Sequence, residues 1–181
     1  MNPVDILIEE HLLVRQFLDN LSIALNKLEK DIRPPREFLD KAIEFAQNFT
    51  DKYHHYKEEY VMFTQLRYLK EGSLESETAF LKQQHKRGRN YIRQISDSLD
   101  GYSERNDYDI STILENLAAY ISLLKNHIHK EDYNFFQMVK ETFPEYVLSG
   151  LVELFDKEDQ KSDANILENS QKLVQEMAAL L

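Results

Sequence analysis

Histidine and glutamate occur at helical spacing in two distant parts of the chain. His54 is followed four residues later by Glu58, and His127 is followed four residues later by Glu131. On an α-helix, residues i and i+4 lie on one face, with about 5–6 Å between their Cβ atoms. Each pair can therefore bring an imidazole and a carboxylate to one metal centre. One such pair is weak evidence by itself, because 32 of the 181 residues are acidic.

Projection of the helical segments at about 100° per residue sorts the six histidines by face. The four histidines that lie on apolar faces, one in each of four segments, are His11, His54, His85 and His127. The projection turns His55 and His129 towards solvent, and it directs Glu59 and Asp132 away from the faces that carry the four histidines. We therefore expect four inward imidazoles from four different helices.

The second half of the chain repeats the first. His85 and Arg89 lie 74 residues after His11 and Arg15, and the two His-x-x-x-Glu pairs lie 73 residues apart. This pattern is typical of a duplicated helical hairpin with approximate twofold symmetry. Such symmetry gives each of two metal ions two histidines and leaves both glutamates free to bridge.

Core histidines that are satisfied by local hydrogen bonds are the alternative interpretation. An unpaired buried polar group costs roughly 2–7 kcal/mol, whereas a whole domain is stable by only about 5–15 kcal/mol. Four histidines and two glutamates in one core without a metal would therefore be too costly. The predicted metal ligands are His11, His54, Glu58, His85, His127 and Glu131.

The composition limits the possible metals and partners. The chain has no cysteine, which excludes disulfides, cysteine-bound zinc and iron–sulfur clusters. Histidine and carboxylate ligands suit ions such as iron or manganese. A formal net charge of −10 argues against nucleic acid as a partner. The first residues lack the features of a signal peptide, and no run of about 18 apolar residues could span a membrane. We therefore expect a cytoplasmic location and no membrane contact.

Helical periodicity runs through the whole chain, which has only four glycines and four prolines. Four long helices are predicted: from about Pro3 to Lys30, from about Arg36 to Leu69 with a stop near Gly72, from Ser73 or Ser76 to about Gly101, and from a cap at Asp109 to about Thr142. Long helices with short connections predict an all-α, up-down-up-down four-helix bundle over residues 1–144.

Residues 145–181 form a predicted C-terminal helical extension. An amphipathic helix is expected over residues 145–155, a charged linker over 157–163 and a last helix over 164–181. We expect this extension to pack against the bundle. A homodimer formed through the last helix is the alternative.

Four segments resemble the hemerythrin-like family, whose members contain the HHE cation-binding domain. The segments EEHLLVRQFL, HHYKEEYVMF, QQHKRGRNYI and NHIHKEDYNFF contain all six predicted ligands in the family's order and spacing. The resemblance covers residues from about 5 to 140. It implies an antiparallel bundle that holds two iron ions joined by an oxo or hydroxo bridge, with the same six residues as ligands.

Two departures from the oxygen-carrying members shape the functional prediction. Those members have a fifth histidine where this chain has Arg89, and an Asp five residues after the last histidine, where this chain uses Glu131 at four. Four histidines and two glutamates resemble the branch that includes iron–sulfur cluster repair proteins. The prediction is therefore binding of, and reaction with, O2, NO or peroxide. The alternative is iron donation, iron–sulfur cluster repair or sensing of iron or oxygen without turnover, and whether the protein is an enzyme stays open.

Residues beside the predicted ligands have two interpretations each. Arg15 and Arg89 either pair with carboxylates near the site or lie at the bundle surface. Gly88 either leaves room for a ligand beside the metal or allows close helix packing. Tyr120 lies on the same helical face as His127 and could contact the site's surroundings.

Overall fold

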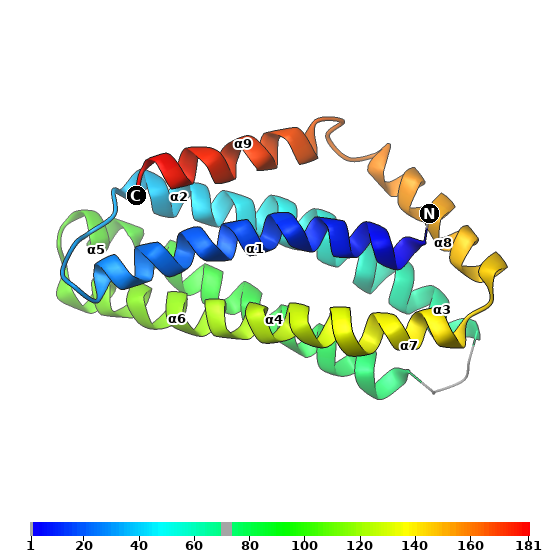
Figure 1. Cartoon of the computed structure of the whole chain (residues 1–181). Coiled ribbons are helices and arrows are strands. Elements are labelled where there is room, and N and C mark those ends of the chain that lie inside the picture. Colours follow the sequence, from blue (N-terminus) through cyan, green and yellow to red (C-terminus); the bar gives the residue numbers. More distant parts are fainter. Residues whose placement is uncertain (1, 70–73) are drawn as a thin grey trace.

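The computed structural model describes residues 2–69 and 74–181 (Figure 1). All regular secondary structure in these residues is helical, which confirms the prediction of an all-α chain. The elements are α1 (Pro3–Leu28), α2 (Arg36–Phe45), the π-helices η1 (Ala46–His55) and η2 (Lys57–Met62), α3 (Phe63–Leu69), α4 (Glu75–Asp97), α5 (Leu99–Ser103), α6 (Asp107–Lys130), the π-helix η3 (Glu131–Phe135), α7 (Phe136–Thr142), α8 (Glu145–Asp159) and α9 (Ile166–Ala179). Gly72 and Ser73, at a predicted helix boundary, lie outside the described residues.

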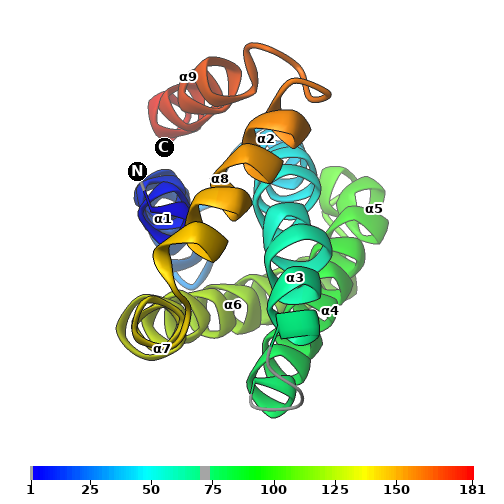
Figure 2. The same ribbon diagram turned by 90° about the vertical axis from the view of Figure 1, so that its right-hand side faces the viewer.

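Four helical rods run side by side through the molecule. They are α1, the run α2–η1–η2–α3, α4, and the run α6–η3–α7. Successive rods run in opposite directions (Figure 1). α6 packs against both α1 and α4, and the view from one end shows the rods arranged around a common core (Figure 2).

The fourth rod begins two residues earlier than predicted. α6 starts at Asp107 rather than after a cap at Asp109, because the side chain of Asn106 accepts hydrogen bonds from the backbone N–H groups of Tyr108 and Asp109. The predicted stop at Gly101 lies inside the short helix α5, which connects α4 to this rod.

Two apolar clusters fill the core on either side of a polar layer. Leu21 and Phe45 belong to the first cluster, and Leu7 and Phe135 belong to the second. Along each rod, the predicted ligands lie close to the point where residues of one cluster give way to residues of the other. Burial of each large apolar side chain contributes about 1.5–3 kcal/mol, so the rods are held firmly on both sides of the polar layer.

The last two helices cover one side of the rods (Figures 1 and 2). α8 adds Leu148, Leu151 and Phe155 to the second apolar cluster. α9 adds Val174 and Met177 to the first. The apolar faces of both helices are therefore buried within the chain. Formation of a homodimer through α9 stays a prediction.

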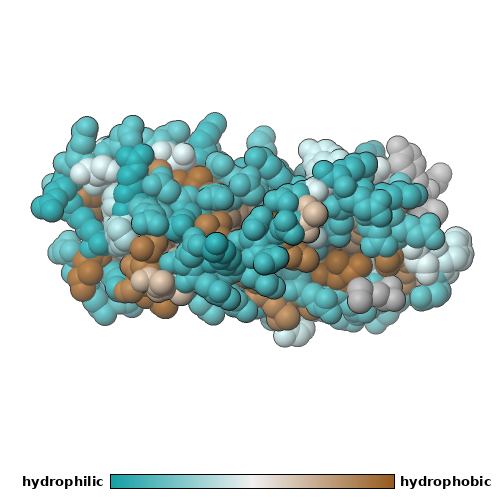
Figure 3. Space-filling view, turned by 90° about the horizontal axis from the view of Figure 1, so that it is seen from above, coloured by the Kyte–Doolittle hydropathy of each residue, from teal (hydrophilic) through white to brown (hydrophobic). Residues whose placement is uncertain are grey.

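Hydrophilic side chains cover most of the face seen from above, and apolar side chains appear there in separate patches (Figure 3). Within residues 2–69 and 74–181, no helix combines the length and the apolar character that crossing a membrane requires.

Candidate metal centre

π-Helical turns change which residues of the second rod face the core. η1 and η2 are wider than an α-helix, because their hydrogen bonds join residues i and i+5. Consecutive residues of this rod therefore both face inward. His55 is 5% exposed and Glu59 is 8% exposed, beside the buried His54 and Glu58. The prediction that His55 and Glu59 face solvent is wrong, since it assumed α-helical geometry.

The same change of geometry occurs in the fourth rod. η3 begins at Glu131, and both Glu131 and Asp132 are buried. The prediction that Asp132 points away from the site is wrong, because its carboxylate accepts a hydrogen bond from Nδ1 of His11 at 2.7 Å. His129 precedes the π-helical turn, and it is exposed as predicted.

The structure brings all six predicted ligands together, each at most 1% exposed. They fall into two groups whose potential ligand atoms lie within 4.8 Å of one another. The His11 group is His11, His54, Glu58 and Glu131, and the His85 group is His55, Glu58, His85 and His127. Glu58 belongs to both groups. The sequence prediction did not include His55.

Glu58 lies between the two groups, with one carboxylate oxygen towards each. Its Oε1 is 3.6 Å from Nε2 of His54, and its Oε2 is 3.4 Å from Nε2 of His85. These separations are long for hydrogen bonds. Two donor atoms that bind one ion at about 2.0–2.2 Å lie about 3–4 Å apart, so the observed separations fit a shared ion on each side.

Glu131 occupies the matching position on the fourth rod. Its Oε2 lies 3.4 Å from Nε2 of His11 and 3.2 Å from Nε2 of His127, so it also reaches histidines of both groups. His85 and His127 approach each other through their Nε2 atoms at 2.9 Å. Both carboxylates are therefore placed where they could bridge two ions.

Buried polar atoms without a partner converge on this layer. Nε2 of His11, Nε2 of His54 and all four carboxylate oxygens of Glu58 and Glu131 lack a hydrogen-bond partner among the described residues. Unsatisfied buried atoms are rare in native proteins, and each needs an explanation. Nitrogen and carboxylate donors around shared points suit a pair of first-row metal ions, so the residues present fit a di-metal site.

Outer hydrogen bonds orient every predicted histidine ligand through Nδ1. The four pairs are His11 with Asp132 at 2.7 Å, His54 with Glu10 at 2.8 Å, His85 with Glu59 at 2.7 Å and His127 with Gln84 at 3.0 Å. A partner at Nδ1 fixes the tautomer and leaves Nε2 as the free donor, as is usual for histidines that bind metals.

The two arginines pair with carboxylates next to the site, which decides between the two interpretations given above. Arg15 forms a hydrogen-bonded ion pair with Asp132. Arg89 donates to Glu59 and to Asp51, each at 2.6 Å. Burial by itself would raise the pKa of Glu59, but hydrogen bonds from His85 and Arg89 lower it overall. Each arginine therefore holds a carboxylate that in turn orients a histidine.

Lys57 supports the outer partner of His54. Its side chain is only 1% exposed, it forms a hydrogen-bonded ion pair with Glu10, and its Nζ lies 3.7 Å from the centre of the Tyr53 ring. Asp159, at the end of α8, is a second carboxylate partner at 3.3 Å. The C-terminal extension is thus connected to His54 through Asp159, Lys57 and Glu10.

The electrostatic environment penalises charge on the inner ligands. Burial, followed by the charge of Glu58, raises the pKa of Glu131, and burial likewise raises the pKa of Glu58. Burial also lowers the pKa of His54 and of His127 well below the usual value. Bound cations would offset the cost of the two facing carboxylates and favour neutral histidines.

A cavity of about 320 Å³ reaches the His85 group from solvent between η1, α4 and α6. His55, His85, Gly88 and Tyr120 are among its lining residues. A Cβ at Gly88 would lie 3.5 Å from the Tyr120 ring, which is ordinary contact, so close packing does not require glycine here. The space beside Gly88 therefore supports the interpretation that it leaves room near the site.

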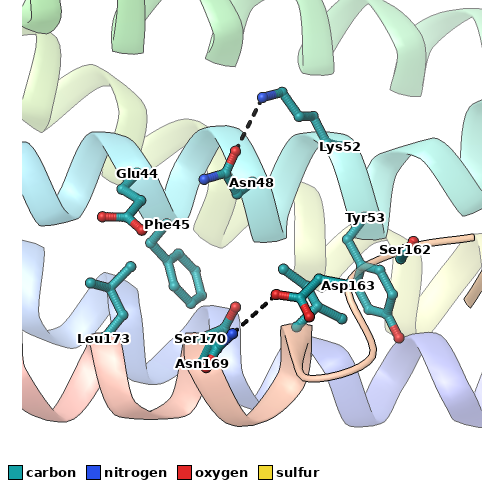
Figure 4. A pocket seen from close by; sticks show the side chains of 11 residues that line it. Glu44, Phe45, Asn48, Lys52, Tyr53, Ser162, Asp163, Asn169, Ser170 and Leu173 are labelled. Carbon is teal, nitrogen blue, oxygen red and sulfur yellow. Dashed lines mark hydrogen bonds between the residues drawn. The ribbon is translucent and has the colours of Figure 1, made fainter.

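Another pocket, of about 380 Å³, lies between the second rod and α9 (Figure 4). Hydrogen bonds from Lys52 to Asn48 and from Asn169 to Asp163 cross its walls. None of the six predicted ligands lines this pocket, so the cavity beside Gly88 is the better candidate for access to the site.

The fold and the His/Glu layer are those of a cation-binding helical domain. The chain belongs to the hemerythrin family, since the model of the hemerythrin HHE cation-binding domain matches residues 2–139.

Curated relatives are more distant. Uncharacterized proteins of Mycobacterium bovis and of two strains of Mycobacterium tuberculosis are each 23% identical to this chain over 155 residues, which are 86% of the chain. The chain spans 60% of the length of these relatives. No solved structure matches the chain.

Proposed function

We propose that this protein is a non-haem di-iron protein that binds and reacts with a small ligand, either O2, NO or peroxide. The proposed ligands are His11, His54, Glu58, His85, His127 and Glu131, with both carboxylates shared between two iron ions. The observation that carries the proposal is the pair of buried carboxylates, each within 3.6 Å of histidine nitrogens from both groups.

The donor set favours iron. Neutral imidazole and carboxylate suit iron and manganese, and the described core offers no thiolate that would favour softer ions. A bound di-iron pair would supply redox chemistry and open coordination positions. The protein's contribution is to hold the imidazoles through Nδ1, to keep water away from the layer, and to share two carboxylates.

Access to the site supports a small, uncharged ligand. The cavity beside Gly88 is lined by Ile92, Tyr120 and Leu124 as well as by polar groups. Arg89 lines the same cavity, and its charge is neutralised by Asp51 and Glu59. O2, NO and hydrogen peroxide are small enough and neutral enough to enter such a space.

We also propose a division of the chain. Residues 1–144 would form the family's up-down-up-down four-helix bundle, and residues 145–181 a helical extension. The burial of the inner ligands argues against the alternative function of iron donation, because a donor has to release its ion, and all six proposed ligands are at most 1% exposed.

The reaction of the reduced, iron-loaded protein with each ligand tests this function. We expect mixing with O2, NO or peroxide to change the optical spectrum within seconds, whereas His127→Ala protein treated in the same way should give only the signal of free iron. His129→Ala is the matched control, since His129 is exposed on the same rod, and it should behave like the native protein. An iron-loaded native protein that stays inert to all three ligands would contradict the proposal.

A further inference from the structure

The two halves of the site are related residue by residue. His11 bonds Asp132, which pairs with Arg15, and 74 residues after the histidine and arginine, His85 bonds Glu59, which pairs with Arg89. The remaining two histidines follow the same rule, with Glu10 behind His54 and Gln84 behind His127. A symmetric site would therefore give both ions the same surroundings.

His55 breaks this symmetry. The residue at the matching place, 73 positions later, is Ile128, which packs in the first apolar cluster. His55 instead lies against the His85 group. Its ring stacks on that of His85, with centroids 3.7 Å apart and planes 14° apart, and it meets the ring of His127 edge-on at 5.7 Å.

Local hydrogen bonding does not account for a histidine at this place. Nδ1 of His55 is buried and has no hydrogen-bond partner among the described residues. The nearest carboxylate, that of Asp51, is 3.6 Å away and is already bonded to Arg89, and a separation of 3.6 Å is too long for a hydrogen bond. An imidazole in this position is costly unless something else uses its nitrogen.

We propose that His55 supplies a third imidazole to the ion held by His85 and His127. A ligand atom of His55 lies within 4.8 Å of ligand atoms of Glu58, His85 and His127. This inference rests on the proposed di-iron function. The two ions are then unequal, with three imidazoles on one and two on the other. The fifth histidine comes from the second rod, through the π-helical turn that points both His54 and His55 inward.

Metal titration of His55→Ala is the test. Metal-free native protein, His55→Ala and the control His129→Ala are titrated with ferrous iron without oxygen, and the Mössbauer spectra of the loaded proteins are compared. We expect two different iron environments in the native protein and in His129→Ala. In His55→Ala, one ion should bind at least about 10-fold more weakly, since even loss of an outer partner of a ligand costs 10–100-fold.

Added imidazole provides a second measurement that does not depend on how well the variant folds. The cavity of about 320 Å³ adjoins His55, so imidazole can enter the space left by the substitution. We expect millimolar imidazole to restore the weakened ion in His55→Ala and to leave His129→Ala unchanged. If His55→Ala binds two ions with native affinity and a native Mössbauer spectrum, the inference is wrong and the di-iron proposal stands. If the native protein itself does not bind two ions, both are wrong.

Discussion

Glu131→Gln should change the stability of the protein in opposite directions with and without metal. In the iron-loaded protein the substitution removes a carboxylate that reaches His11 and His127, so metal is lost, and with it a stabilisation of about 2.7 kcal/mol at a metal concentration 100-fold above Kd. In metal-free protein it removes one of two facing buried carboxylates whose pKa is raised by burial. Removing that charge should stabilise the fold by about 1–3 kcal/mol.

Thermal unfolding with and without iron measures both effects. For a chain of this size, 1 kcal/mol shifts Tm by roughly 2–4 °C, so both shifts are measurable. His129→Ala should change neither Tm. A Glu131→Gln variant that keeps its iron and its native Tm would show that Glu131 is not a ligand.

Lys57→Met should destabilise the protein strongly even without metal. Lys57 is 1% exposed and forms a hydrogen-bonded ion pair with the buried Glu10. Methionine keeps the packing against Tyr53 and Phe155 but leaves the carboxylate of Glu10 buried without its charge partner. Removal of one member of a buried pair costs about 3–5 kcal/mol. Urea unfolding of metal-free native and variant proteins gives this difference directly.

The double variant Glu10→Gln with Lys57→Met is the matched control. Glutamine at position 10 can still accept the hydrogen bond from Nδ1 of His54, as Gln84 does for His127 in the other half of the site. We therefore expect the double variant to recover most of the lost stability. If Lys57→Met alone costs less than about 1 kcal/mol, the ion pair does not support the site as described.

The sequence contained enough to predict the helical class and the convergence of six residues. His54 with Glu58 and His127 with Glu131 are pairs four residues apart, and such pairs share a face in α-helical and in slightly wider geometry. The chain's duplication independently pointed to the same residues. Both signals depend on spacing along one helix, which a sequence displays.

The inward position of His55, Glu59 and Asp132 was not predictable in the same way. It follows from the π-helical turns of η1, η2 and η3, and no residue type marks such turns as glycine or proline marks others. The outer pairs join different rods, and their formation depends on packing. One available signal was overlooked: Glu59 and Asp132 follow the two ligand glutamates at the same 73-residue offset, which predicts equivalent roles for them.

The iron content of the native protein tests the central claim most directly. Protein loaded anaerobically with ferrous iron and freed of unbound metal should contain about two iron ions per chain, because two groups of histidines share Glu58 and Glu131. Elemental analysis against protein concentration gives this ratio. Two ions per chain is the predicted result, and a ratio at or below one ion per chain, in protein whose six proposed ligands are intact, would contradict a di-iron site.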